Sequence, residues 1–317
     1  MALSLIETLI KEELPLSEQI TLLEELNRMP ITGDLLAGGT RIIQKHGKMH
    51  LQETMDVLDI VGTGGDAKGL FNISTTAAFV LAASGVPVIK HGGSGVSSSS
   101  GSVDLLKALG VVLPKQAAAA YHAFQEFGLV FIFAGYFHPN WGKLKAARQE
   151  LAKRGQRTLF NLLGPLCNPF NPKYQALGVY DPALVPAFAE ALLLLDRQGM
   201  VFSSEGCDEL TLSENHRIMQ VYRGQALDFT LKLADVGLKP GVLEDLKGGD
   251  PSVNATLTQN ILNGADQGPR HQVVLLNALM GLLAYRPDLS LHEAWVRLES
   301  SLESGLAALK LKRLQEG

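Results

Sequence analysis

The apolar residues of the first fifty positions recur with the period of an α-helix. Leu3, Ile6 and Leu9 lie three residues apart, so they would share one face of a helix. Further helices are expected over 16–26 and 32–46, where leucine and isoleucine repeat at the same spacing. The N-terminal part of the chain is therefore predicted to be helical.

From residue 56 onwards the pattern changes to short apolar runs that alternate with helical segments. The runs expected to be strands are 57–61, 86–90, 129–134, 175–180, 199–203 and 218–222, with a hairpin-like return at 226–231. The helices expected between most of them are 73–84, 102–109, 115–126, 141–154 and 183–197. Helical periodicity returns over about 251–313, with helices expected at 257–262, 273–284 and 292–311. Strands that alternate with helices are typical of a mostly parallel sheet covered on both faces.

Together the two patterns predict an α/β fold: a small N-terminal helical domain and a larger α/β domain with a mostly parallel central sheet flanked by helices. We expect the helical domain at 1–54, either alone or joined by a segment near 110–155, and the α/β domain at 55–317. A chain of 317 residues is long enough for both. Its 32 glycines and 6% aromatic content suit an enzyme of this class that has many glycine turns.

Charge and cysteine content narrow the possible classes of protein. The chain has 28 basic and 32 acidic residues, whereas proteins that bind duplex DNA usually carry a basic excess. Six basic residues gather over 143–157, either as a solvated helix face or as a functional patch. Cys167 and Cys207 are far apart and form no CxxC motif, which argues against a disulfide framework or a cysteine zinc site.

Targeting signals are not evident in the sequence. The N-terminus lacks the basic region of a secretory signal, and no apolar run approaches the ~20 residues of a membrane span. A soluble cytoplasmic protein is therefore expected.

Two glycine-rich turns each follow a predicted strand and carry polar residues. The first turn is Gly62–Asp66, before the helix-start signal Asn72–Thr75, and the second is Lys90–Gly93, before a serine run. Glycine allows backbone N–H groups to approach an anion, and hydroxyls, a helix N-terminus and a lysine add donors and charge. The alternative is that these are only tight strand-to-helix turns. Tight turns alone would not explain why polar residues cluster at these strand ends. Ligands bind at the carboxyl ends of the strands in open α/β sheets.

Two further motifs are ambiguous when taken alone. Residues 157–169 (RTLFNLLGPLCNP) form either a loop packed on the sheet or one wall of a ligand pocket. Asp208 and Glu209 follow a predicted strand and could simply be solvated. Beside a phosphate site they become candidate Mg²⁺ ligands, because Mg²⁺ prefers one or two carboxylates plus water and phosphate oxygens.

These motifs, in this order, resemble the anthranilate phosphoribosyltransferase family from about residue 30 to the end. The family pattern GTGGD…NIST…KHGN is met with departures by the two glycine turns, and FNxLGPLxNP is met fully by Phe160–Pro169. The acidic pair in its DE-(I/L/V)-(S/T) context is met by Asp208–Thr211.

The resemblance implies an enzyme of tryptophan biosynthesis that transfers the phosphoribosyl group of phosphoribosyl pyrophosphate (PRPP) to anthranilate and releases pyrophosphate. It implies a PRPP-binding α/β domain, Mg²⁺ as cofactor, and a homodimer formed through the helical domain. No dedicated acid or base is expected, because the aromatic amine of anthranilate is neutral and nucleophilic at pH 7.

The resemblance also assigns site residues by position. PRPP would bind at Gly62, Gly64, Gly65, Asp66, Asn72, Ser74, Thr75, Lys90, Ser97, Ser98 and Ser102. Anthranilate would bind at Gly62, His91, Gly93, Arg148 and Pro165, and Mg²⁺ at Ser74, Asp208 and Glu209.

The chain departs from the family pattern on the acceptor side. Gly93 and Ser94 replace an Asn-Arg pair, and Ser99 replaces a lysine. The segment between the acceptor arginine and Arg157–Asn161, which matches the family's RT-x-FN motif, is about three residues longer than in the family. The acceptor carboxylate could therefore be bound by Arg148 or by Arg154. A phosphoribosyltransferase or nucleoside phosphorylase with another acceptor, and a non-catalytic nucleic-acid-binding relative, are the alternative interpretations.

Overall fold

The protein is built on one mixed sheet whose strands lie in the order β3-β2-β1-β4-β5-β6-β7. The computed structural model describes residues 1–49, 54–65, 67–93 and 100–316. The strands are β1 (Met55–Gly62), β2 (Val88–Gly92), β3 (Leu129–Phe133), β4 (Pro172–Gly178), β5 (Gln198–Ser204), β6 (His216–Tyr222) and β7 (Gln225–Asp228). The five strands from β3 to β5 are parallel, and β6 and β7 add to the edge antiparallel. The predicted mostly parallel sheet is confirmed.

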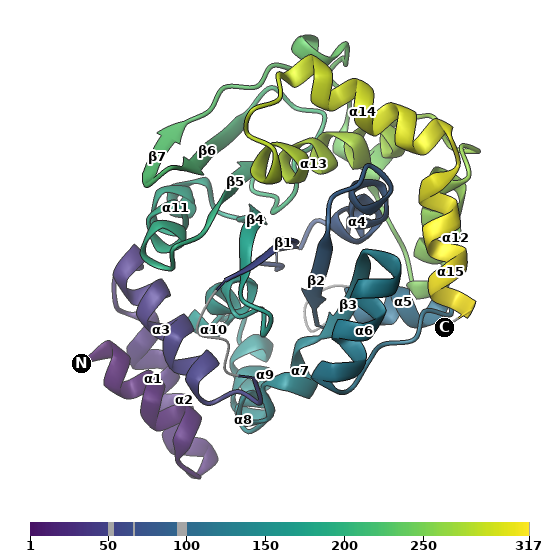
Figure 1. The fold of residues 1–317 in the computed structure, drawn as a ribbon. Coiled ribbons are helices and arrows are strands. Elements are labelled where there is room, and N and C mark those ends of the chain that lie inside the picture. The colour runs from purple at the N-terminus through teal and green to yellow at the C-terminus, as the bar shows by residue number, and fades with distance from the viewer. Residues whose placement is uncertain (50–53, 66, 94–99, 317) are drawn as a thin grey trace.

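One face of the sheet is covered by helices from the middle and the end of the chain (Figure 1). These helices are α4 (Ile73–Ala83), α5 (Ser102–Ala108), α12 (Pro251–Leu262), α13 (Pro269–Tyr285), α14 (Leu291–Glu303) and α15 (Leu306–Glu316). Every residue of α13 from Val273 to Ala284 is buried, as expected for a helix that is apolar all round. This core fixes α4, whose N-terminus lies beside the first glycine turn.

The opposite face is covered by the N-terminal helices together with a later segment (Figure 1). These helices are α1 (Ala2–Lys11), α2 (Leu16–Asn27), α3 (Gly33–Lys45), α9 (Lys145–Lys153), α10 (Leu159–Leu163) and α11 (Val185–Leu194). Close contacts join the two parts: the Gly33 N–H donates to the Glu190 carboxylate, and Gly39 leaves room for Leu163. Of the remaining helices, α6 (Ala117–Phe127) and α7 (Ala134–Phe137) lie towards the β3 edge, and α8 (Pro139–Gly142) contacts α1.

Three segments differ from the sequence-based prediction. Residues 159–166, expected as a loop or pocket wall, form α10 and the 3₁₀ turn η1 (Gly164–Leu166), because Asn161 caps the helix by accepting from the Thr158 N–H. The single helix expected near the C-terminus is divided into α14 and α15 at Gly305, whose φ is +74°. The helix expected over 141–154 is divided into α8 and α9.

Among the described residues, no helix combines the length and apolar character needed to cross a bilayer. Cys167 and Cys207 are both free thiols in the interior, and burial raises the pKa of Cys167 to about 12.

Candidate active site

The carboxyl ends of β1, β4 and β5 bring the first glycine turn and the acidic pair together. The register pairs Gly62 with Gly178, and the Thr63 N–H donates to the Gly178 carbonyl at 3.0 Å. Gly64 and Gly65 then turn the chain with φ values of +66° and +76°, which favour glycine over any other residue. Asp66, expected to bind PRPP, lies outside the described residues.

Asp208 is inserted into this turn from the loop after β5. Its Oδ2 accepts a hydrogen bond of 2.6 Å from the Gly64 N–H. A Cβ atom at Gly62 would overlap this carboxylate, and a Cβ atom at Gly178 would overlap the Asp208 carbonyl oxygen. Gly62 and Gly178 therefore permit the close approach of Asp208, and sequence reasoning did not identify Gly178 because its neighbour is distant in the chain.

Glu209 lies at the N-terminus of α4, where helix N–H groups favour negative charge. Its Oε1 accepts from the Ser74 N–H at 3.2 Å. The next residue, Leu210, is held at both backbone atoms by the buried Asn277 of α13, at 2.9 and 2.8 Å. Asn277 thus fixes the acidic loop, a role for which the chain carries no local signal.

Lys90 is the buried cation of the cluster. Only 4% of it is exposed, and its Nζ donates to the Ile60 carbonyl and, at 3.3 Å, to the Ser74 hydroxyl. Burial lowers the pKa of Lys90, while the charges of Asp59, Glu209 and Asp208 act in the opposite direction. The predicted phosphate lysine and the predicted metal carboxylates are therefore neighbours.

The acidic pair fits a magnesium site by its donors. Asp208 and Glu209 each accept a backbone N–H, and carboxylate oxygens are ligands that Mg²⁺ prefers in proteins. The described residues contain no group of three or more His, Cys, Asp or Glu side chains arranged to hold a metal. A site with two carboxylates suits Mg²⁺, which usually retains water and substrate phosphate oxygens.

The other predicted PRPP residues lie around the same turn. The Asn72 amide donates to the Ser100 carbonyl at 3.1 Å, and its oxygen accepts from Asn254 at 3.0 Å. Thr75 is 1% exposed, so its side chain faces the interior. The Ser102 hydroxyl donates to the Gly93 carbonyl at 3.3 Å. Ser97 and Ser98 lie outside the described residues, as do the departures at Ser94 and Ser99.

His91 and Pro165 are brought together on the other face of the sheet. His91 Nε2 lies 2.9 Å from the carbonyl oxygen of Gly164, the residue before Pro165. His91 Nδ1 lies 2.6 Å from Asp59 Oδ2. The contact between His91 and Gly164 thus joins the segment Leu163–Pro165 to the end of β2, next to Lys90.

Arg148 and Arg154 have different surroundings. Arg148 is partly buried, its guanidinium lies 5.7 Å from the centre of the Trp141 ring, and its buried Nε has no hydrogen-bond partner. Burial lowers the pKa of Arg148 to about 10, so it remains charged at pH 7. Arg154 is at the surface in ion pairs with Glu150 and Glu24. Of the two, Arg148 is the one whose buried Nε has no hydrogen-bond partner among the described residues.

A match to a family model covers most of the chain. Residues 54–308 match the model described as "Glycosyl transferase family, a/b domain". Anthranilate phosphoribosyltransferase from Lacticaseibacillus casei (strain BL23) is 39% identical over 296 residues, which are 93% of this chain and 85% of that protein. The chain belongs to the anthranilate phosphoribosyltransferase family. It is an enzyme, a phosphoribosyltransferase of the glycosyltransferase type.

Solved structures of the family agree with the fold of this phosphoribosyltransferase. The anthranilate phosphoribosyltransferase from Thermus thermophilus superimposes with a TM-score of 0.90 at 39% identity, covering 99% of this chain and 94% of that one. The enzyme from Saccharomyces cerevisiae, solved in complex with PRPP and Mg, gives a TM-score of 0.85 at 26% identity, covering 99% and 90%.

The basic run of this phosphoribosyltransferase is not a uniform cationic patch. Lys143 pairs with Glu13 at 3.7 Å, and Lys153 and Arg154 pair with Glu150. Arg157 has an aromatic partner: its guanidinium stacks 3.8 Å from the centre of the Tyr180 ring and lies against Gly65. Arg157 therefore adds positive charge beside the first glycine turn, a placement that sequence spacing did not reveal.

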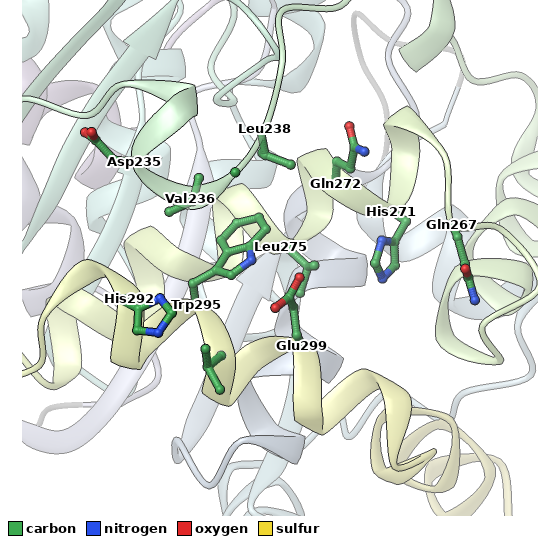
Figure 2. Close-up of a pocket in the computed structure, with 12 residues that line it drawn as sticks. Asp235, Val236, Leu238, Gln267, His271, Gln272, Leu275, His292, Trp295 and Glu299 are labelled. Atoms are coloured by element: carbon green, nitrogen blue, oxygen red, sulfur yellow. The ribbon is translucent and has the colours of Figure 1, made fainter.

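A separate pocket of the phosphoribosyltransferase lies between α13, α14 and the 3₁₀ turn η3 (Leu233–Val236), as Figure 2 shows. Its volume is about 540 Å³, and His271, Trp295 and Glu299 are among its lining residues. None of the motif residues lines it, so it is not part of the candidate active site.

Proposed function

We propose that the candidate active site transfers the phosphoribosyl group of PRPP to anthranilate and releases pyrophosphate. The observation that carries the proposal is the convergence of two glycine turns, the buried Lys90 and the adjacent carboxylates Asp208 and Glu209 at one edge of the sheet. PRPP carries several negative charges, and backbone N–H groups, hydroxyls and a cation meet that requirement.

The donor side would be formed by both glycine turns and by the start of α4. In this proposal PRPP contacts Gly62, Gly64, Gly65, Asp66, Asn72, Ser74, Thr75, Lys90, Ser97, Ser98 and Ser102. Since the Thr75 side chain is buried, Thr75 would act through its backbone N–H at the helix N-terminus. Arg157, which has its guanidinium beside Gly65, would add charge at the mouth of this site.

Mg²⁺ would be held by Asp208, Glu209 and the Ser74 hydroxyl. The yeast relative was solved with PRPP and Mg, which supports the cofactor assignment. Bound Mg²⁺ would offset the negative charge that the departing pyrophosphate acquires. Lys90 donates to the Ser74 hydroxyl, so it would orient that oxygen.

Mg²⁺ affinity should increase with pH. Burial and the neighbouring Asp208 raise the pKa of Glu209 to about 8, so below that pH Glu209 holds a proton that the metal must displace. The dissociation constant for Mg²⁺ should therefore fall from about pH 6 to about pH 8 and level off above, with up to about one proton released per ion near pH 7. Calorimetry in buffers of different ionisation enthalpy measures both quantities, and an affinity that is flat over this range would contradict the assignment of Glu209.

The acceptor side would be formed by Gly62, His91, Gly93, Arg148 and Pro165. Arg148 would bind the carboxylate of anthranilate, because it is partly buried and its Nε has no hydrogen-bond partner among the described residues. Pro165 would lie against the ring in a turn that His91 holds in place. The amine of anthranilate is nucleophilic without a base, so these residues need only orient it towards C1′ of the ribose.

Restoring the family's asparagine at Gly93 should strengthen acceptor binding. A Cβ atom at Gly93 meets no atom within 4 Å among the described residues, so the side chain fits. We expect Gly93→Asn to lower the KM for anthranilate by about threefold to tenfold, because one hydrogen bond contributes about 0.5–1.5 kcal/mol. Steady-state kinetics with saturating PRPP would measure this change, and an unchanged KM would mean that the position does not contact the acceptor.

Residues 1–54, together with part of the segment 110–155, would form a helical domain that builds a homodimer. Leu3 and Leu16 on α1 and α2 are apolar and more than 40% exposed, which supports a partner surface there. The described helices α8 and α9 already pack beside α1 and α2 (Figure 1).

The acceptor is tested by measuring pyrophosphate release with a panel of acceptors at fixed PRPP and Mg²⁺. The proposal predicts that anthranilate gives the highest kcat/KM, ahead of other aromatic amines and of free nucleobases. Faster release with another acceptor would assign the site to a different phosphoribosyl transfer.

A further inference from the structure

The segment Gly164–Asn168 is held in an unusual way, because each of its five carbonyl oxygens faces a donor from a different side chain. The partners are His91 for Gly164 (2.9 Å), Gln175 for Pro165 (3.0 Å), Arg197 for Leu166 (2.9 Å), His138 for Cys167 (2.7 Å) and Gln44 for Asn168 (3.2 Å). These partners come from α3, β2, β4 and the segments before α8 and β5. The backbone around Pro165 is therefore fixed from several directions.

His91 is the partner that links this segment to the catalytic edge of the sheet. It follows Lys90 in β2, and successive side chains of a strand point to opposite faces. Lys90 accordingly reaches Ser74 on α4, while His91 reaches Gly164. A shift of the His91 ring would move the Pro165 turn relative to Lys90.

Asp59 determines where the His91 ring lies. Asp59 is fully buried in β1, its Oδ1 accepts from the His91 backbone N–H at 3.2 Å, and its Oδ2 lies 2.6 Å from Nδ1. The Gly164 carbonyl on the other side of the ring can only accept. The Asp59 carboxylate and the His91 ring must therefore hold two protons between them to make both hydrogen bonds. An imidazolium with N–H groups at both nitrogens donates one to Asp59 and one to the Gly164 carbonyl.

The charges around Asp59 favour this arrangement. Lys90 from β2 and Arg197, which precedes β5, both interact electrostatically with Asp59. Arg197 is 2% exposed, and among the described residues it has amide and carbonyl partners but no carboxylate in hydrogen-bond contact. His138 also interacts electrostatically with His91. The side chains of Lys90 and Arg197 thus lie near the Asp59 carboxylate.

We propose that Asp59 is a positioning residue for the acceptor: through His91 it fixes the Gly164–Pro165 turn against which the acceptor ring binds. The inference rests on the proposed function for the identity of the acceptor, and on the described contacts for the arrangement of protons. Asp59 touches neither substrate. No hydrogen bond from Asp59 to the glycine turn or to the acidic pair occurs in the described part of the chain, so its link to the donor side is its charge near Lys90.

Two substitutions separate hydrogen bonding from charge. Asp59→Ala removes both bonds to His91, and we expect the KM for anthranilate to rise at least about tenfold, because small misplacement of a substrate-positioning group is costly. The kcat should change by less than about twofold, and the dissociation constant of PRPP should change less than the KM for anthranilate, because Asp59 reaches the donor side only through its charge near Lys90. Asp59→Asn can accept from the backbone N–H and donate to Nδ1, which leaves Nε2–H for Gly164, so the KM should stay within about threefold of the unmodified enzyme. Ser301→Ala, which removes a buried hydroxyl from α14, is the control for general loosening.

Nitrogen NMR of ¹⁵N-histidine-labelled protein tests the arrangement without turnover. The His91 signals, assigned by their loss in His91→Gln, should show hydrogens on both ring nitrogens at neutral pH in the unmodified enzyme and on Nε2 alone in Asp59→Asn. A ring with a single hydrogen in the unmodified enzyme would overturn the proposal. An unchanged KM for anthranilate in a folded Asp59→Ala protein would also overturn it. So would a rise of the KM above about tenfold in Asp59→Asn, and this second result remains decisive if Asp59→Ala does not fold. If anthranilate is not turned over but the ring carries both hydrogens, the proposed acceptor fails and the proton arrangement stands.

Discussion

Asp208→Asn is expected to lower kcat/KM for PRPP by at least about a hundredfold, the scale found when one group that stabilises developing charge is removed. Asparagine has nearly the same shape, and its amide oxygen can still accept from the Gly64 N–H. What is lost is the carboxylate charge of Asp208, beside Lys90 and at the proposed metal site. Initial rates over a range of PRPP and Mg²⁺ concentrations would show the loss as a higher Mg²⁺ requirement together with a lower maximum rate.

Two further variants make that result specific. Glu209→Gln should behave in the same way, because Glu209 is the second carboxylate of the pair. Asp228→Asn, which removes an exposed acid paired with Arg217, should leave the rate and the Mg²⁺ requirement unchanged. A folded Asp208→Asn protein with the unmodified rate and Mg²⁺ dependence would show that the acidic pair is not the metal site.

Arg148→Lys is expected to raise the KM for anthranilate about tenfold to a hundredfold. A hydrogen bond to a charged group contributes about 1.5–3 kcal/mol, and lysine cannot reproduce the planar, two-pronged contact of a guanidinium with a carboxylate. The KM for PRPP should change little, because Arg148 stacks on Trp141 and contacts no residue of the first glycine turn among those described. Steady-state kinetics with each substrate varied in turn would separate the two constants.

Arg154→Lys is the matched control. Arg154 is at the surface and already paired with Glu150 and Glu24, so its replacement should leave both KM values within about twofold. If Arg154→Lys weakened anthranilate binding and Arg148→Lys did not, the acceptor carboxylate would have to be placed at the other end of α9.

Much of the fold followed from local pattern. The alternation of apolar runs and helical segments from residue 56 predicted the parallel strands, because each strand and helix is specified by its own residues. The predicted element bounds were wrong where one residue type is common both in loops and at helix ends. Asn161 was interpreted as a loop residue but caps α10, and Gly305 interrupts a helix whose apolar period continues beyond it.

The site was predictable only in part. The glycine turns and the acidic pair are contiguous motifs, and their polar residues point to chemistry without a structure. The choice between Arg148 and Arg154 depends on Glu24, which lies far away in the sequence on α2. The roles of Asp59, Gly178 and Asn277 likewise arise from contacts with distant segments, so no local spacing could reveal them.

The most direct test of the central claim is the loss of anthranilate fluorescence when the purified protein is mixed with PRPP, Mg²⁺ and anthranilate, with pyrophosphate counted in the same sample. The account predicts that one pyrophosphate is released for each anthranilate consumed, and that a chelator of Mg²⁺ stops both. No loss of anthranilate at millimolar substrate, or pyrophosphate release that is independent of anthranilate, would contradict it.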